Sequence, residues 1–269
     1  MKLGQTTEYK NKLGTAIELY KNGKTTREIS NLIGMDNSVL RENLRENGFK
    51  VKDSNYNETI NRNAFSSIKT EEQAYWLGFL YADGYVAKDS NRIELTIKDK
   101  EHVEKFAEFL FLNKSVVKEK IGRIKERNFS GLYYRLSIRN VQIHSDLIAK
   151  GCTPKKSLTL VFPKEDILPK ELQNHFVRGY FDGDGSLGIY SNKGAKPTPQ
   201  LSIIGTKEFL DSIKKIYDLP ENKYTRCGKA FQYATVSKSQ VEKFLISIYK
   251  NSVVYLDRKY NLFIDCRFE

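Results

Sequence analysis

The sequence contains one short pattern twice, and this internal repeat restricts the possible folds more than any other feature. Residues 76–84 and 177–185 share a frame of glycine, aromatic, two variable residues, small residue, aspartate and glycine. The two aspartates, Asp83 and Asp184, are 101 positions apart. A repeat at this interval indicates two copies of one structural unit.

The residues after each copy predict the same elements in the same order. After the first copy we expect strands, a helix, strands and a helix over residues 85–87, 92–98, 100–112, 116–124, 133–138 and 141–150. After the second copy the matching ranges are 187–190, 200–204, 207–217, 224–227, 231–236 and 239–249. The predicted fold is α+β, with two pseudo-symmetric αββαββα repeats over residues 71–163 and 164–269 and two antiparallel sheets.

A lysine recurs at a matched distance from each aspartate. Lys156 follows Asp83 by 73 residues, and Lys259 follows Asp184 by 75. Each repeat therefore supplies one acid and one lysine. The neighbouring cations, Lys155 and Arg258, are the alternative candidates for the cation that accompanies each acid.

The aspartates stand where a carboxylate is locally unfavourable. The simplest interpretation is that they end two buried helices before C′ glycines, Gly84 and Gly185. However, a carboxylate at a helix C-terminus faces the negative end of the helix dipole, and two such carboxylates also repel each other. A divalent cation removes both penalties, so the repeated acid indicates a metal site. Oxygen ligands favour Mg²⁺ over zinc.

Small residues accompany the acids in both copies. They lie four positions apart, at Gly78, Ala82, Gly179 and Gly183. Small side chains at this spacing allow two helices to approach closely. This spacing would allow the two motif helices to pack against each other.

Over residues 71–269 the repeated motif resembles that of the monomeric LAGLIDADG homing endonucleases. The resemblance implies a saddle with the motif helices at its centre, and Mg²⁺ ions, two or more, held by Asp83 and Asp184 with the carbonyls of Ala82 and Gly183. Mn²⁺ or Ca²⁺ would substitute for binding. It also implies catalytic roles for Lys156 and Lys259. The partner implied is double-stranded DNA with a long asymmetric target. A monomer would cut this DNA and leave 3′ overhangs. The biological setting implied is intron homing by a mobile element.

The two copies differ at two positions that concern the site. The first acidic position of the motif is Asp182 in the second repeat but Tyr81 in the first, so we do not expect Asp182 to be an essential ligand. The polar residue that positions water in the family falls on Asp99 in the first repeat and on Gly205 in the second. We therefore expect the two strands to be cut at unequal rates.

Alternating polar residues along the predicted strands suggest the surface that faces DNA. Polar and apolar residues alternate in residues 92–97 and 135–139, which is typical of a sheet with one wet face. The candidates for DNA contact in the first repeat are Arg92, Glu94, Thr96, Arg135, Ser137 and Arg139. Those in the second repeat are Gln200, Ser202, Arg226 and Gln232.

Residues 1–50 predict a separate all-α module. Helical periodicity runs over residues 10–22, Thr25 with Glu28 forms a capping-box pattern, and a third helix starts near residues 36–38. The apolar residues expected inside the second and third helices are Ile29, Leu32, Ile33, Val39, Leu40 and Leu44. This order resembles a helix-turn-helix unit, although small three-helix bundles with other functions look similar. Its groove-facing candidates are Asn37, Ser38, Arg41 and Arg45. The polar residues 51–70 are interpreted as a linker.

The net charge of +12 is spread along the chain. Residues 1–70, 71–163 and 164–269 carry 12, 16 and 17 Lys and Arg against 8, 12 and 13 Asp and Glu, so each part contributes +4. An even positive excess favours a long polyanionic partner. No apolar run suits a membrane span, and the N-terminus lacks a signal-peptide core. We expect a cytoplasmic protein without membrane contact that is bacterial or phage-encoded, with an organellar protein as the alternative.

Other patterns give no competing site. The three scattered cysteines suit neither a disulfide framework nor zinc, and the isolated His102, His144 and His175 are expected at the surface or the edge of the core. The main alternative function is a DNA-binding regulator or an RNA maturase that keeps the fold without cleaving. The second alternative is a nicking enzyme, because the two repeats differ.

Overall fold

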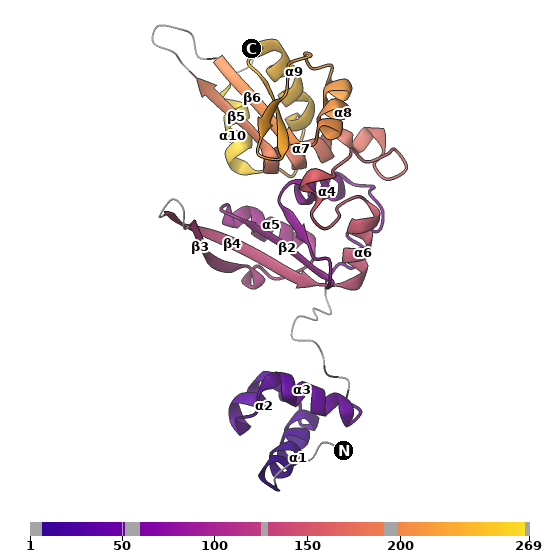
Figure 1. The fold of residues 1–269 in the computed structure, drawn as a ribbon, viewed down its shortest axis with the longest axis vertical. Coiled ribbons are helices and arrows are strands. Elements are labelled where there is room, and N and C mark those ends of the chain that lie inside the picture. The colour runs from indigo at the N-terminus through magenta and orange to yellow at the C-terminus, as the bar shows by residue number, and fades with distance from the viewer. Residues whose placement is uncertain (1–6, 50, 52–59, 125–128, 191–197, 267–269) are drawn as a thin grey trace. The chain divides into compact units, whose positions relative to one another are not determined.

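The computed structural model describes residues 7–49, 51, 60–124, 129–190 and 198–266. The chain forms two compact units, Met1–Tyr56 and Asn57–Glu269 (Figure 1). Within the described residues, no helix combines the length and the apolar character that crossing a membrane requires.

The N-terminal unit is a set of three helices, α1 (Thr7–Lys21), α2 (Thr26–Ile33) and α3 (Asn37–Glu46). The predicted capping box begins α2: the Thr25 hydroxyl accepts from the Glu28 amide, and the Glu28 carboxylate accepts from the Thr25 amide at 2.8 Å. Gly34 ends α2 in the left-handed conformation, at φ 63°. Two residues separate it from α3, so the order is helix, short turn, helix.

The core of this unit is smaller than the apolar pattern predicts. Ile29, Leu40 and Leu44 are buried, whereas Leu32 is 62% exposed and Val39 is 39% exposed. The prediction that Leu32 and Val39 point inward is therefore wrong. Three short helices enclose a single core, and these two side chains near the turn lie outside it.

The C-terminal unit contains the predicted repeat. The first copy comprises α4 (Glu71–Ala82), β1 (Gly84–Val86), β2 (Arg92–Ile97), α5 (Lys100–Phe109), β3 (Lys118–Ile124), β4 (Phe129–Arg139) and α6 (Val141–Ala149). The second comprises α7 (Gln173–Asp184), β5 (Gly185–Tyr190), β6 (Thr198–Gly205), α8 (Lys207–Tyr217), β7 (Thr225–Cys227), β8 (Ala230–Thr235) and α9 (Lys238–Tyr249). A further helix, α10 (Asp257–Asp265), follows the second copy. The predicted αββαββα order is confirmed in both copies.

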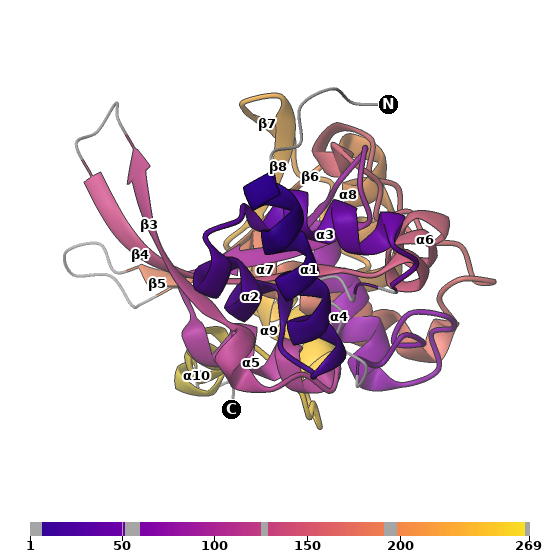
Figure 2. The same cartoon turned by 90° about the horizontal axis from the view of Figure 1, so that it is seen from below.

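Each repeat has a four-stranded antiparallel sheet. The strand orders match, β1-β2-β4-β3 and β5-β6-β8-β7. The glycine after each acid also occupies the same register, because Gly84 lies opposite Leu95 and Gly185 lies opposite Ile203. In Figure 1 the two repeats meet at α4 and α7, and Figure 2 shows the β3–β4 hairpin extending beyond the rest of its sheet.

Helices α4 and α7 cross at a pair of glycines. A Cβ atom on Gly78 would lie 2.0 Å from the carbonyl oxygen of Phe176, and one on Gly179 would lie 2.0 Å from that of Tyr75. Any larger residue at either position would push the backbones apart. The glycines of the motif therefore set how closely the two acids approach.

The central part of α4 is buried on every side. All its residues from Ala74 to Tyr81 are buried, as expected for a helix enclosed between two halves of one core. An ion pair also joins the repeats at the other end of the helices: the buried guanidinium of Arg178 donates to Glu71 at 2.6 Å. One continuous hydrophobic core extends through both repeats.

The expected linker over residues 51–70 is too long. Ala64, Phe65 and Ile68 are buried in the core of the repeats, and the Asn61 amide donates to the Leu110 carbonyl at 3.0 Å. Residues 52–59 lie outside the described residues. Its few apolar residues show no helical or strand periodicity, so the sequence does not indicate that they fill a space beside α5.

The glycines after the acids are not left-handed helix caps. Gly185 is extended, at φ −88° and ψ 160°, and Gly84 is the first residue of β1. A Cβ atom on Gly84 would lie 2.6 Å from the Leu80 carbonyl oxygen, and one on Gly185 would lie 2.1 Å from the Phe181 ring. Glycine is required because the chain passes directly from helix to strand against its own last turn.

Candidate active site

The two acids lie at the ends of the paired helices. Asp83 is the C-cap of α4, and Asp184 is the last residue of α7. A Cβ atom on Gly183 would lie 3.3 Å from Oδ2 of Asp83, so the carboxylate of one repeat lies over the backbone of the other. The absence of a side chain at Gly183 keeps this space open.

The fold holds both carboxyl groups in a setting that disfavours their charged forms. Desolvation raises the pKa of Asp184 to about 6, and the nearby charge of Asp83 adds to the shift. Desolvation also raises the pKa of Asp83, although Lys259 and Lys156 oppose it. Neighbouring protein atoms desolvate the Asp83 carboxyl group in part, but the residue is exposed, so ligands can still reach it. These are the conditions that a bound cation would relieve.

Each repeat brings its lysine to the start of its own first strand. Lys156 is buried, and its Nζ donates to the carbonyl of Gly84. Lys259 is also buried, and its Nζ donates to the carbonyls of Gly185 and Phe181. The two lysines thus make the same contact with the glycine after each acid. Burial lowers the pKa of Lys259 to about 8.

The neighbours Lys155 and Arg258 differ from these lysines. Arg258 is more than half exposed, and its Nε donates to Asp99 at 3.1 Å across the two repeats. Lys155 adopts a left-handed conformation at φ 59° before the short helical turn η3 (Lys156–Leu158). Neither side chain makes the glycine-carbonyl contact described for Lys156 and Lys259.

Asp99 lies near the acids, and its charge raises the pKa of Asp83. The expected correspondence between Asp99 and Gly205 is wrong. The register of the two sheets makes Gly205 the equivalent of Ile97, because Leu95 and Ile203 lie opposite the motif glycines and Ile97 and Gly205 each follow them by two residues. Asp99 precedes α5 as Thr206 precedes α8, and the connection in the second repeat is one residue shorter.

The six candidates of the first sheet share its open face. Cross-strand pairs join Arg92 with Arg139, Glu94 with Ser137 and Thr96 with Arg135. The intervening residues of β2 and β4 are buried under helix α5. The open face carries mixed charge, and Arg92 lies 3.7 Å from Glu94.

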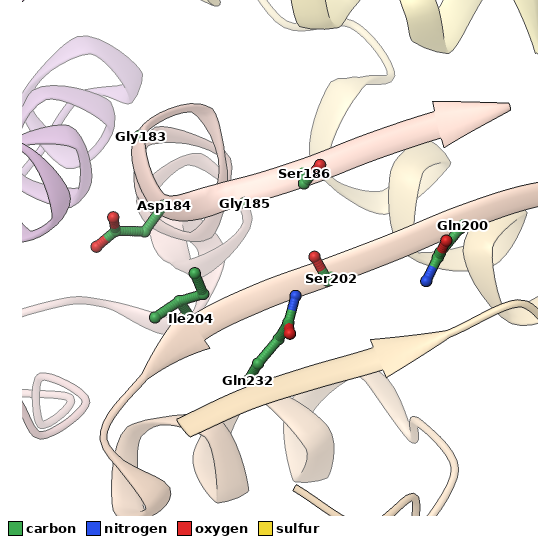
Figure 3. A pocket seen from close by; sticks show the side chains of 8 residues that line it. All are labelled: Gly183, Asp184, Gly185, Ser186, Gln200, Ser202, Ile204 and Gln232. Atoms are coloured by element: carbon green, nitrogen blue, oxygen red, sulfur yellow. The ribbon is translucent and has the colours of Figure 1, made fainter. Parts of the chain in front are cut away.

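The second sheet presents a polar but uncharged surface beside its acid. Figure 3 shows a pocket in which Asp184 projects from the end of α7 and polar side chains project from β5, β6 and β8. The residues that line it are Gly183, Asp184, Gly185, Ser186, Gln200, Ser202, Ile204 and Gln232. Three predicted contact residues, Gln200, Ser202 and Gln232, thus form one surface with the acid.

Arg226 does not belong to this surface. It lies opposite Phe231, whereas Thr225 lies opposite Gln232, so Arg226 points to the other face of the sheet. Its guanidinium lies over the Phe231 ring at 5.6 Å. The prediction failed because β7 has only three residues, all exposed, and shows no alternation.

Several residues of the open faces were missed. Tyr85 lies opposite Glu94, and β3 pairs Lys118 with Arg135 and Lys120 with Tyr133. The alternation of Lys118 and Lys120 was a usable signal. Ser186, opposite Ser202, was hidden in the motif turn.

The helix-turn-helix candidates all lie on α3. Asn37 is the first residue of the helix and is half-buried, as is Arg41, whereas Ser38 and Arg45 are exposed. The spacing of four between Asn37, Arg41 and Arg45 places these three on one side of the helix.

Within the described residues, no group of three or more His, Cys, Asp or Glu could hold a metal ion. A cation between Asp83 and Asp184 would therefore need oxygens besides these carboxylates. Mg²⁺ commonly binds in this way, through one or two carboxylates together with water and substrate phosphates. The two acids fit such a site.

Comparison with known proteins identifies the first repeat most directly. Residues 70–145 match the model of the LAGLIDADG-like domain. The replication factor C small subunit of Methanocaldococcus jannaschii is 31% identical over 121 residues, which cover 45% of this chain and 6% of that protein. An uncharacterized protein of the same organism is 26% identical over 189 residues, 65% of this chain and 64% of that protein. The chain thus spans less than two thirds of either relative.

Among solved structures, the homing endonuclease I-WcaI bound to its DNA recognition sequence superposes with a TM-score of 0.51. The likeness covers 75% of this chain and 91% of that one at 12% identity, so it concerns the fold alone. Residues 70–145 therefore match the LAGLIDADG-like domain, and the two repeats together have a fold like that of the LAGLIDADG homing endonucleases.

Proposed function

We propose that this chain is a site-specific endonuclease that hydrolyses both strands of a DNA target with a divalent metal and leaves 3′ overhangs. One observation carries the proposal: the Asp83 carboxylate lies over Gly183, close enough for its charge to raise the pKa of Asp184, and each repeat holds a buried lysine at the glycine after its acid. A protein that only bound DNA would gain nothing from acids placed against a polyanion. The repeated pair of acid and lysine suits chemistry on two phosphates.

Asp83 and Asp184 would hold Mg²⁺, with the main-chain carbonyls of Ala82 and Gly183 as further ligands. The raised pKa values of the two acids support this role, because a cation would offset their desolvation and their mutual repulsion. When bound, the metal supplies an activated water and stabilises the leaving oxygen of a phosphodiester. Mn²⁺ would support the same chemistry, and Ca²⁺ would support binding.

The lysines would stabilise negative charge that develops on the phosphate. An ammonium group has three N–H donors, and the described carbonyl contacts use one on Lys156 and two on Lys259. Each lysine thus keeps at least one donor for a phosphate oxygen or water. Asp99, held by Arg258 close to Asp83, would orient a water on the first side only.

The open sheet faces would bind DNA. The protein would act as a monomer on a long asymmetric site. The contact residues we propose are Arg92, Glu94, Thr96, Arg135, Ser137 and Arg139 in the first repeat and Gln200, Ser202 and Gln232 in the second. The face of the second sheet adjoins Asp184, and the similar structure of I-WcaI is described as bound to its recognition sequence. A homing role in a mobile element is the biological setting that we propose.

Selection from a randomised duplex library tests the function. The full chain is incubated with Mg²⁺, and molecules with new ends are captured and sequenced. Enrichment of one long sequence with a fixed stagger and 3′ overhangs is expected. Enrichment by binding in Ca²⁺, without cleavage in Mg²⁺ or Mn²⁺, would refute the nuclease and favour a regulator. Binding of folded RNA alone would favour a maturase.

The N-terminal unit would add affinity by docking on DNA beside the target, through Asn37, Ser38, Arg41 and Arg45 on α3. A tethered second site raises affinity through its effective concentration without changing the chemistry. Deletion of residues 1–56 should weaken binding and flatten its salt dependence, with the cleavage position unchanged. A salt titration of both proteins on one long target measures this. Equal affinity and equal slope would show that the unit has another purpose.

A further inference from the structure

The residue two positions before each acid ties α4 or α7 to the segment that carries the lysine of the same repeat. In the second repeat this residue is Asp182, which is 1% exposed. Its carboxylate accepts from the Tyr249 hydroxyl at 2.5 Å, from the Tyr75 hydroxyl at 2.7 Å and from the Leu256 amide at 2.8 Å. A buried carboxylate with three donors is a rigid anchor.

The bond to Leu256 leads directly to Lys259. Leu256 is the N-cap of α10, and its carbonyl accepts from the Lys259 amide at 2.9 Å. Asp182 therefore fixes the first turn of the helix that presents Lys259. The Lys259 ammonium then returns to α7 at the Phe181 carbonyl, next to Asp182. Asp182 and Lys259 are thus joined by a continuous set of contacts through Leu256 and Phe181.

The first repeat makes an equivalent connection with different chemistry. Tyr81 is buried at the matching position, and its hydroxyl donates to the Lys150 carbonyl at the end of α6. The next residues stay close to α4, because the Cys152 thiol lies 3.4 Å from the Leu80 carbonyl. This segment continues to Lys156, whose ammonium returns to Gly84. A neutral phenol here replaces the carboxylate of the second repeat.

The same residues also allow a simpler explanation, in which they only hold the core together. Tyr75 belongs to the first repeat, and its hydroxyl lies 3.0 Å from Nε2 of the buried His102. His102, which was expected at the surface or the core edge, thus extends the Asp182 contacts across the repeat junction. Loss of a junction contact would affect both halves of the site equally.

We propose that Asp182 and Tyr81 are positioning residues, each of which holds the lysine of its own repeat and so controls the cutting of one DNA strand. This inference rests on the proposed nuclease function. The two residues do the same task with unequal strength, since Asp182 has three donors and Tyr81 donates one bond to Lys150. The difference would make the two strand rates unequal.

Strand-resolved kinetics test the assignment. Duplex labelled on either strand is cut by the full chain and by Asp182→Asn, Tyr81→Phe, Lys259→Ala and Lys156→Ala variants. Asp182→Asn should slow by about tenfold or more the strand that Lys259→Ala slows most, with the other strand within about twofold. Tyr81→Phe should slow the strand most sensitive to Lys156→Ala by a smaller factor. Equal slowing of both strands by Asp182→Asn would overturn the proposal.

A double-mutant cycle distinguishes positioning from general damage. Asp182→Asn added to Lys259→Ala should cause little further loss on that strand, whereas Asp182→Asn added to Lys156→Ala should be additive. Additive losses with both lysines would overturn the proposal. If Asp182→Asn does not fold, Tyr249→Phe removes one of the three donors and takes its place in the cycle.

Amine reactivity provides a readout that needs no cleavage, so it separates failure of this inference from failure of the proposed function. Trace acetylation with acetic anhydride, quantified by mass spectrometry, measures the accessibility of each lysine. Asp182→Asn should increase labelling of Lys259 several-fold and leave Lys156 unchanged, and Tyr81→Phe should do the reverse. Unchanged labelling, or an equal rise at both lysines, would refute the inference even in a protein that cuts no DNA.

Discussion

The two repeats share a backbone plan but present different surfaces. Strand order, the register of the motif glycines and the contact between lysine and glycine carbonyl are the same in both. The open face of the first sheet is charged, with Arg92, Glu94, Arg135 and Arg139, whereas the pocket of the second presents serine and glutamine around Asp184. The fold fixes where a side chain stands, and the sequence is free to vary what stands there. This arrangement suits a target whose two halves differ.

Removal of either acid is the strongest test of whether the repeats are equivalent at their centre. Asp83→Asn or Asp184→Asn should abolish double-strand cleavage while specific binding stays within about tenfold, because the acids would bind metal and not bases. Cleavage and gel-shift titrations in Mg²⁺ and Ca²⁺ measure the two effects. Asp89→Asn, an exposed carboxylate in the turn after β1, is the matched control. Full cleavage by either active-site variant would refute the metal site.

The lysines should have the next largest effect. Lys156→Ala and Lys259→Ala should each lower the cleavage rate by roughly 10² or more with little change in affinity, since charge would be stabilised mainly in the transition state. Lys155→Ala is the matched control for Lys156, one residue away and without the glycine contact. Arg258→Ala tests the alternative to Lys259 and should cost less than Lys259→Ala, although it also releases Asp99. Single-turnover rates decide the assignment: a larger loss for Lys155→Ala or Arg258→Ala than for the neighbouring lysine would transfer the role to that residue.

The two sheet faces should respond differently to salt. Arg135→Ala should weaken DNA binding and reduce the slope of log affinity against log salt by about one, as expected for a lost phosphate contact. Gln232→Ala should leave the slope unchanged and weaken only targets with the preferred base, by about 1–3 kcal/mol. Affinities measured over a salt series on matched and mismatched duplexes test both. Equal slopes for the two variants would remove the distinction between the faces.

The smallest expected effect concerns stability without metal. The pKa of Asp184 is raised to about 6 by desolvation and by Asp83, so above this pH the folded state carries a charge that it disfavours. Asp184→Asn should therefore stabilise the metal-free protein at about pH 8 by on the order of 1 kcal/mol, or about 2–4 °C in Tm. The gain should shrink towards about pH 5, where the folded carboxyl group is already protonated.

Thermal unfolding in EDTA at the two pH values measures this gain. Asp83→Asn should gain less, because Lys259, Lys156 and Arg258 stabilise that carboxylate. Destabilisation by Asp184→Asn at the higher pH would contradict the electrostatic account.

Local periodicity predicted the helices and strands. It did not predict the features that depend on contacts between residues far apart in the sequence. The motif repeat located α4 and α7, and the matched spacing located Lys156 and Lys259. The bonds of Asp182 to Tyr75 and Leu256 join residues 107 and 74 positions apart, and no local pattern indicates them. Arg226 was misplaced because a three-residue strand carries too little alternation to fix its register.

The two acids are brought together only when α4 and α7 cross at their glycines during folding. The eight residues from Ala74 to Tyr81 are buried, and the helix that crosses them, α7, lies roughly one hundred residues later in the chain. The first repeat is synthesised first, and closing such a long connection is among the slower steps of folding. A chain in which only the first repeat has folded presents Asp83 alone, and its helix α4 is not yet covered by α7. Correct long-range folding is therefore the condition under which the two carboxylates come together, and an incomplete chain has no paired site at which the proposed cleavage could occur.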